Sequence, residues 1–107
     1  MLRQEGERMK VYISGAITGQ INYFERFAAA EDLLKKGGYE VVNPAEELAE
    51  LPMGTAHERY MEKSLELLST CDGIYMLDGY ESSLGANIEL KYAISHKMTI
   101  CFEKGVK

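Results

Sequence analysis

The sequence has few cysteines and no long apolar run. Its two cysteines, Cys71 and Cys101, lie far apart with no histidine cluster beside them, which argues against a zinc site. No apolar run approaches the roughly 20 residues of a membrane-spanning helix, and no signal peptide is visible. We therefore expect a cytoplasmic protein with buried free thiols, no metal and no organic cofactor.

A block of basic residues is also missing. The net charge is −5, and lysines and arginines are not clustered, which argues against nucleic acid polymers and membranes as partners. A free nucleoside or nucleotide stays compatible, because helix N-termini and backbone amides can bind a phosphate. With 107 residues, 46% of them hydrophobic and 27% charged, the chain has the length and composition of one globular domain.

Short apolar segments alternate with amphipathic ones along the chain. The apolar segments, which predict strands, are residues 10–14, 39–44, 73–77 and 98–102. The amphipathic segments, which predict helices, are residues 21–36, 56–70 and 82–96. In the first helix we expect Phe24, Phe27, Ala28, Ala30, Leu33 and Leu34 to face the core. Residues 1–9 are charged and patternless and predict a flexible tail, which leaves one domain over residues 10–107.

This alternation predicts an α/β fold. Apolar strands separated by helices favour a small doubly wound, flavodoxin- or Rossmann-like parallel sheet of four or five strands with helices on both faces. Ligands of such folds bind beyond the carboxyl ends of the strands. We therefore expect the loops at residues 14–19 and 78–83 to face a site. Residues 45–55 predict an irregular flap over it.

The first of these loops, "SGAITG", matches neither a dinucleotide fingerprint nor a Walker loop. Two interpretations stay open. Either its glycines serve a tight strand-to-helix turn, or Gly15 and Gly19 let the backbone approach a base or sugar. We count Ser14, Gly15, Ala16 and Gly19 as candidate substrate-binding residues, with Asp78 from the second loop.

The segment "SSLGANIEL" carries the most chemistry. Ser82 or Ser83 is suited to cap a helix, and the free amides of the first turn favour an anion. Helical spacing places the small residues Gly85, Ala86 and Ala93 on the same face as Glu89. A ligand could therefore press against a carboxylate in a groove of small residues. The alternative is a surface glutamate and a simple helix cap.

Four motifs, "VYISGAITG", "VVNPA", "CDGIYML" and "SSLGANIELKYA", resemble the nucleoside 2-deoxyribosyltransferase superfamily over about residues 10–102. The resemblance implies that Glu89 attacks the anomeric carbon of a 2′-deoxyribonucleoside and that Tyr12 holds this carboxylate. In the branch that hydrolyses 2′-deoxynucleoside 5′-monophosphates, a serine at the position of Ser83 binds the phosphate, whereas the transferase branch usually has an aspartate there. The resemblance also implies that the chain forms a homodimer or a larger homo-oligomer.

One position departs from the superfamily pattern. The aspartate that usually protonates the leaving base lies eight residues before the position of Asp72, where this chain has Ser64. A serine is a poor general acid, and Asp78 or Glu62 could substitute. Two functions therefore stay open: an N-glycosidic bond hydrolase or transferase, and a catalytically weak nucleotide-binding module. Tyr80 could stack on a base, and we expect His57 and His96 to be solvated.

Overall fold

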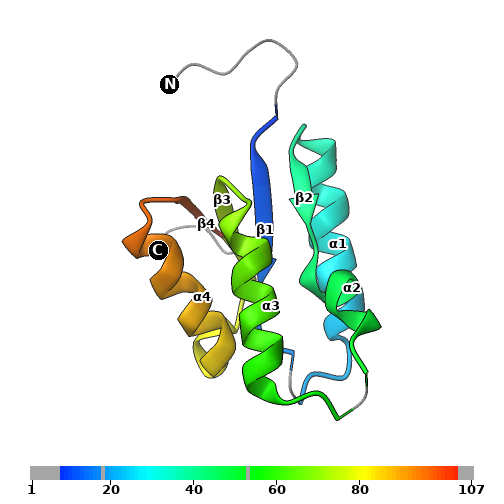
Figure 1. Ribbon diagram of the computed structural model, residues 1–107. Helices are drawn as coiled ribbons and strands as arrows, with labels where there is room; N and C mark the ends of the chain where they lie inside the picture. The colour runs from blue at the N-terminus through cyan, green and yellow to red at the C-terminus, as the bar shows by residue number, and fades with distance from the viewer. Residues whose placement is uncertain (1–7, 18, 53, 104–107) are drawn as a thin grey trace.

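A computed structural model describes residues 8–17, 19–52 and 54–103 of the chain. Its centre is a sheet of four parallel strands in the order β2-β1-β3-β4 (Figure 1). The strands are β1 (Lys10–Ser14), β2 (Glu40–Val42), β3 (Gly73–Met76) and β4 (Thr99–Phe102). The predicted doubly wound α/β class is confirmed, with four strands in the described residues.

The helices cover both faces of this sheet. Helix α1 (Tyr23–Lys36) packs on one face against Val11 and Ile13 of β1. Helices α3 (His57–Ser69) and α4 (Leu84–Ser95) lie side by side on the other face (Figure 1). Tyr12 points to that second face, because successive side chains of a strand point to opposite sides. Shorter helical turns are α2 (Pro44–Glu47), η1 (Leu48–Glu50) and η2 (Tyr80–Ser82).

The strand order positions the site. The chain leaves β1 towards β2 on one side, and after β2 it crosses to β3 on the other side of β1. Connections that diverge from neighbouring strands leave a crevice beyond the carboxyl ends of those strands. Here that crevice lies beyond Ser14 of β1 and Met76 of β3, which are paired in register.

The apolar face of α1 is narrower than its sequence predicts. Phe27, Ala30 and Leu34 are buried as expected, but Phe24 and Leu33 are 46% and 60% exposed, and Ala28 is exposed as well. The reason is geometric: the helix meets the sheet along one stripe of spacing three and four. Phe24 and Leu33 lie beside that stripe.

Two segments predicted to be irregular have more structure than expected. Residues 45–55 begin within α2, where Asn43 accepts a hydrogen bond from Ala45 N at 3.0 Å and Pro44 occupies the first turn. At the other end of the chain, residues 1–7 of the predicted tail lie outside the described residues. Met9 packs against the core, and its carbonyl accepts a hydrogen bond from Glu40 N.

The cysteines are free, as predicted, but they are not buried. Cys71 is half-buried and Cys101 is exposed. Cys101 lies on β4, an edge strand of the sheet, whose residues alternate between exposed and half-buried. Within the described part of the chain, no helix is long and apolar enough to cross a bilayer.

Candidate active site

Glu89 is a buried carboxylate held by two hydroxyl groups. Only 7% of the residue is exposed. The Tyr12 hydroxyl donates to Glu89 Oε2 and the Ser14 hydroxyl donates to Glu89 Oε1, each at 2.6 Å. Hydrogen bonds to an ionised acceptor of this length are strong. Both carboxylate oxygens are thus fixed in direction, and each keeps further lone pairs for a ligand.

The local sequence explains this arrangement. Tyr12 and Ser14 are two residues apart on the central strand β1, so both side chains point to the face that α3 and α4 cover. On α4 the buried residues are Ala86, Glu89 and Ala93, which form one stripe at spacings of three and four. Because the two alanines are small, α4 approaches the sheet closely enough for the Glu89 side chain to reach both hydroxyls.

Ser64 belongs to the same cluster. It is 4% exposed, and its hydroxyl donates to the carbonyl of Met61 at 3.1 Å, one turn earlier on α3. The position to which the superfamily resemblance assigns a proton donor is therefore next to the carboxylate, but it carries a hydroxyl group whose proton is already bound to a backbone carbonyl.

Burial dominates the electrostatics of the cluster. Removal from water raises the pKa of Glu89, and the hydrogen bonds from Ser14 and Tyr12 only partly oppose this rise. Burial and then the negative charge of Glu89 raise the pKa of Tyr12 well above 10. Tyr12 therefore keeps its proton as a hydrogen-bond donor, and Glu89 is a stronger base than an exposed glutamate.

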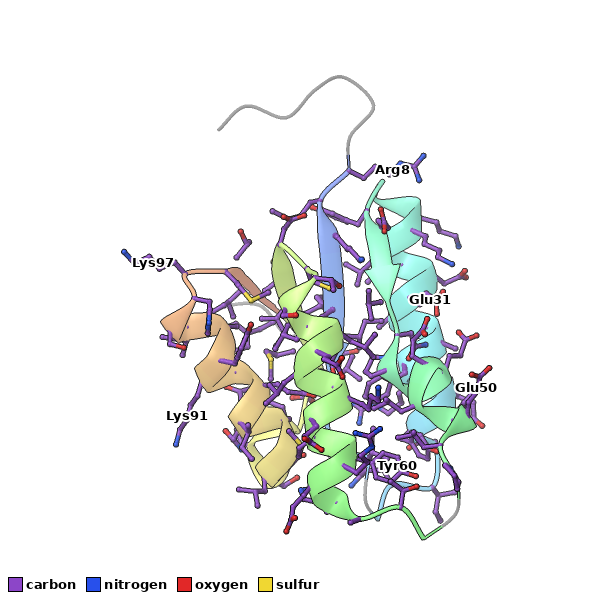
Figure 2. The ribbon with its side chains drawn as sticks, in the orientation of Figure 1. Arg8, Glu31, Glu50, Tyr60, Lys91 and Lys97 are labelled. Atoms are coloured by element: carbon purple, nitrogen blue, oxygen red, sulfur yellow. The ribbon has the colours of Figure 1, made fainter. Side chains whose placement is uncertain are left out.

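A cavity of about 700 Å³ opens onto this cluster. Its lining comes from β1 and the loop after it, the start of α1, the α2–η1 segment, α3 and the start of α4. Figure 2 shows Tyr60 of α3 in the space towards α2, whereas Glu50 lies on the outer side of its segment. The walls are largely apolar, and the polar groups lie at Glu89 and at the beginnings of α3 and α4.

Most of the predicted site residues meet at this cavity. The lining includes Tyr12, Gly15, Ala16, Ser83, Gly85, Ala86 and Glu89, and Ser14 binds the carboxylate directly. Gly19 and Asp78 are not in the lining. Asp78 is an exposed residue whose backbone carbonyl accepts from Arg26 and whose amide donates to Glu103, both at 2.7 Å.

Backbone conformation and packing explain why glycine occupies two positions of the first loop. A Cβ on Gly15 would lie 2.9 Å from Leu77 Cβ, so packing against the end of β3 requires a glycine there. Gly19 has φ +78°, which L-residues other than glycine rarely adopt. The turn interpretation therefore accounts for both residues, although Gly15 also lines the cavity.

Ser83 is the residue that caps α4. Its hydroxyl oxygen accepts a hydrogen bond from Ala86 N at 3.1 Å, which leaves the hydroxyl proton free to donate. Gly85, one turn before Glu89, is closely covered: a Cβ there would lie 3.3 Å from Met61 Sδ. The beginning of α4 thus presents a hydroxyl, free amides and bare backbone to the cavity.

The sequence did not identify several of the cavity's walls. His57, Tyr60 and Met61 of α3 line it, together with Tyr23 and Phe27 of α1. The three α3 residues could have been found from the sequence, because they lie at spacings of three and four along the helix between His57 and Ser64. Tyr80, expected to stack on a base, is not in the lining and packs against Phe102, with ring centroids 5.7 Å apart.

Neither substitute for the missing aspartate lies in the lining. Glu62 is exposed on α3 and forms an ion pair with Arg59 at 3.7 Å. Asp78 is exposed, and its backbone is hydrogen-bonded to Arg26 and Glu103. Among the described residues, no group of three or more histidine, cysteine or acidic side chains could hold a metal ion.

Comparison with known proteins identifies a family. The model of a family described as a domain of unknown function (DUF4406) matches residues 9–102, which include every strand and helix given above. No curated protein matches the sequence.

Proposed function

The chain belongs to this family of unknown function, and we propose that it cleaves the N-glycosidic bond of 2′-deoxyribonucleotides or 2′-deoxyribonucleosides, with Glu89 as the nucleophile. One observation carries the proposal: a carboxylate with a raised pKa is buried at a large cavity and oriented by the hydroxyls of Tyr12 and Ser14. The resemblance of the four sequence motifs to the nucleoside 2-deoxyribosyltransferases supports the same chemistry.

The carboxylate suits the proposed reaction. When the bond between C1′ and the base breaks, the sugar gains oxocarbenium character, which an adjacent carboxylate stabilises or captures as a covalent ester. A deoxyribose forms this cation more easily than a ribose, because it lacks the electron-withdrawing 2′-hydroxyl. Water as the acceptor gives hydrolysis, and a second base gives transfer.

The cavity walls fit the parts of a nucleotide. Tyr23, Phe27 and Met61 provide apolar and aromatic surface for a base. The free hydroxyl proton of Ser83 and the amides that begin α4 provide donors for a 5′-phosphate. This favours a monophosphate over a free nucleoside.

Ser64 supports a second candidate function. It replaces a proton donor with a hydroxyl that is bound to Met61 O, and the loss of a general acid typically slows a reaction about 10²- to 10⁴-fold. A nucleotide-binding module that retains the cavity but turns over slowly, or not at all, would have this arrangement.

The two functions separate in an assay for released base. The protein is incubated with deoxynucleosides, their 5′-monophosphates and the matching ribonucleotides, beside Glu89→Gln, and free base is quantified by chromatography. A second set of reactions contains an excess of another free base, to detect transfer. Thermal stabilisation of both proteins by each compound measures binding independently of turnover.

Release of base that disappears in Glu89→Gln, with this variant still stabilised by nucleotide, is the expected result. Stabilisation without release from any substrate would favour the binding module. The absence of both base release and thermal stabilisation would contradict both functions.

A further inference from the structure

Cleavage of an unactivated base requires a proton at its ring, and the cluster around Glu89 supplies none. The Ser64 hydroxyl donates to Met61 O, and the Tyr12 hydroxyl donates to Glu89 with a pKa well above 10. The carboxylates that could have replaced the aspartate, Glu62 and Asp78, do not line the cavity. A proton donor must therefore come from elsewhere in the lining.

Five titratable side chains of the described residues line the cavity: Tyr12, Tyr23, His57, Tyr60 and Glu89. Glu89 is the proposed nucleophile, and Tyr12 is engaged with it. Phenols are weak acids near neutral pH, which argues against Tyr23 and Tyr60. Histidine is the residue type whose charge ordinarily changes between pH 5 and 8 and is the commonest general acid of enzymes.

His57 is also placed to act on the leaving group. It is the first residue of α3 and precedes Ser64 by seven residues, which is close to two helical turns. Both residues therefore lie on the same face of α3, with about 10 Å of helix between them. His57 is exposed whereas Ser64 and Glu89 are buried, so His57 marks the open end of the cavity and Glu89 its closed end.

A nucleotide whose sugar contacts Glu89 would extend its base along this face of α3 towards His57. Among the described residues, the His57 imidazole has no hydrogen bond or ion pair, so its ring is available to a ligand. Resting on the proposed function, we propose that His57 is a catalytic residue that protonates the departing base.

The proposed cleavage forms one bond to C1′ and breaks another. A carboxylate oxygen of Glu89 forms a bond to C1′ while the bond between C1′ and the base nitrogen breaks. The electron pair of the broken bond goes to the base, and the imidazolium proton of His57 goes to a ring nitrogen of that base. Water then attacks C1′, its proton passes to the neutral imidazole, and the Glu89 carboxylate is released.

A substrate that needs no proton provides the test. The base of an N7-methylated 2′-deoxyguanosine 5′-monophosphate is already cationic and leaves without protonation. His57→Gln is expected to lower kcat for 2′-deoxyguanosine 5′-monophosphate about 10²- to 10⁴-fold and to leave kcat for the methylated substrate near that of the unchanged protein. His96→Gln, which changes the exposed histidine at the end of α4, outside the cavity lining, is the matched control and should affect neither.

The outcomes distinguish the two proposals. Equal losses on both substrates, or no loss on either, would overturn the role of His57 while Glu89→Gln remained inactive. Base release that persists in Glu89→Gln, or its absence from the unchanged protein with both substrates, would overturn the proposed function and the role of His57 with it. Because His57 is exposed at a helix start, the variant should fold, and its thermal unfolding checks this.

Discussion

At the scale of single residues, Glu89 illustrates how burial and hydrogen bonding compete. Burial raises the pKa of the carboxyl, whereas the Ser14 and Tyr12 hydroxyls stabilise the ionised form. A nucleophilic carboxylate benefits from both effects: desolvation increases its basicity, and the two hydroxyls fix the direction from which it attacks. We therefore expect the hydroxyls to matter for catalysis more than for folding.

Tyr12→Phe tests this expectation. The variant keeps the ring in the core but removes a hydrogen bond to a charged acceptor, worth about 1.5–3 kcal/mol. We expect kcat/KM for base release to fall about ten- to a hundredfold, and the acidic limb of its pH profile to move to higher pH, because the pKa of Glu89 rises further. Ser14→Ala should act in the same direction.

The matched control is Tyr75→Phe, which removes a phenol from the neighbouring strand on the opposite face of the sheet. It should change neither the rate nor the position of the limb. An acidic limb that stays in place in Tyr12→Phe would mean that Tyr12 does not tune the carboxylate.

A substitution at Ser83 tests whether this residue binds the 5′-phosphate of the substrate. Ser83→Asp keeps an oxygen that can cap α4 through Ala86 N but places a negative charge where the phosphate would bind. We expect kcat/KM for deoxynucleoside 5′-monophosphates to fall at least tenfold, as for the loss of a charge-assisted hydrogen bond, with little change for the free nucleosides. Kinetics with paired substrates measure this ratio.

Ser83→Thr, which retains the hydroxyl, should preserve the preference for monophosphates. If Ser83→Asp lowers kcat/KM equally for nucleosides and monophosphates, Ser83 does not bind the phosphate.

At the scale of elements, α3 and α4 form the site through small residues in their contact. Gly85 lies under Met61, whose flexible side chain could yield by a few tenths of an ångström to a Cβ at 3.3 Å. The glycine is therefore not demanded by helix packing, and α4 would gain up to about 1 kcal/mol from an alanine there. Its presence is better explained by the space it leaves beside Glu89.

Gly85→Ala and Gly85→Leu separate these roles. We expect Gly85→Ala to unfold at an equal or higher temperature than the unchanged protein. Gly85→Leu should weaken binding of a deoxynucleoside 5′-monophosphate about tenfold or more, in line with overpacking effects of about 1–3 kcal/mol. Calorimetric titration in the Glu89→Gln background measures binding without turnover.

Ile94→Ala, on the exposed far end of α4, is the control and should bind normally. Normal binding by Gly85→Leu would show that this wall of the cavity does not contact the ligand.

The elements also mark the limit of what the sequence can predict. Strand β1 and the three long helices follow from apolar periodicity and end signals, and their observed bounds differ from the predicted ones by at most two residues. The buried stripe on α1 could not be predicted in full, since Phe24 and Leu33 are apolar but lie beside the line of contact. Which of several apolar residues faces the sheet depends on how the helix is rotated, which tertiary packing decides.

The same limit holds for the site. Helix capping and helical spacing indicated Ser83 and Glu89 as candidates, and the superfamily resemblance added Tyr12; the structure places all three at one cavity. The sequence could not exclude Asp78, because its loop follows the correct strand. In the structure, the backbone of Asp78 is hydrogen-bonded to the side chains of Arg26 and Glu103. Nor did the sequence identify His57, because the convergence of α3 with α4 depends on the crossover from β2 to β3.

At the scale of the whole molecule, the site reduces stability. Because folding raises the pKa of Glu89 above its unfolded value of about 4.3, the native state binds more protons than the unfolded state between the two values. The free energy of unfolding therefore falls as the pH rises through this window. The stability that the protonated carboxyl provides is complete below the unfolded pKa and is lost above the folded one.

Glu89→Gln should remove this dependence. The neutral side chain can still pair with both hydroxyls, so we expect the variant to be more stable than the unchanged protein at pH 8, with the difference shrinking towards pH 4. Urea unfolding at several pH values measures it. A difference that grows on acidification would mean that folding lowers the pKa of Glu89.

The order of the strands explains why one carboxylate can be both buried and accessible. Divergence of the chain at β1 and β3 leaves room beyond their carboxyl ends, while α3 and α4 close the cavity from one side. Glu89 lies at the closed end, where water is excluded and electrostatic effects are strongest. The proposed function requires that carboxylate to act as a nucleophile.

Capture of the covalent intermediate tests this claim most directly. The protein is mixed with a 2′-deoxynucleoside 5′-monophosphate that it cleaves, quenched with acid during turnover and analysed by intact and peptide mass spectrometry. We expect a mass increase of one deoxyribosyl phosphate group on the peptide that contains Glu89, and none in Glu89→Gln. Base release without any adduct, continuing in Glu89→Gln, would contradict it.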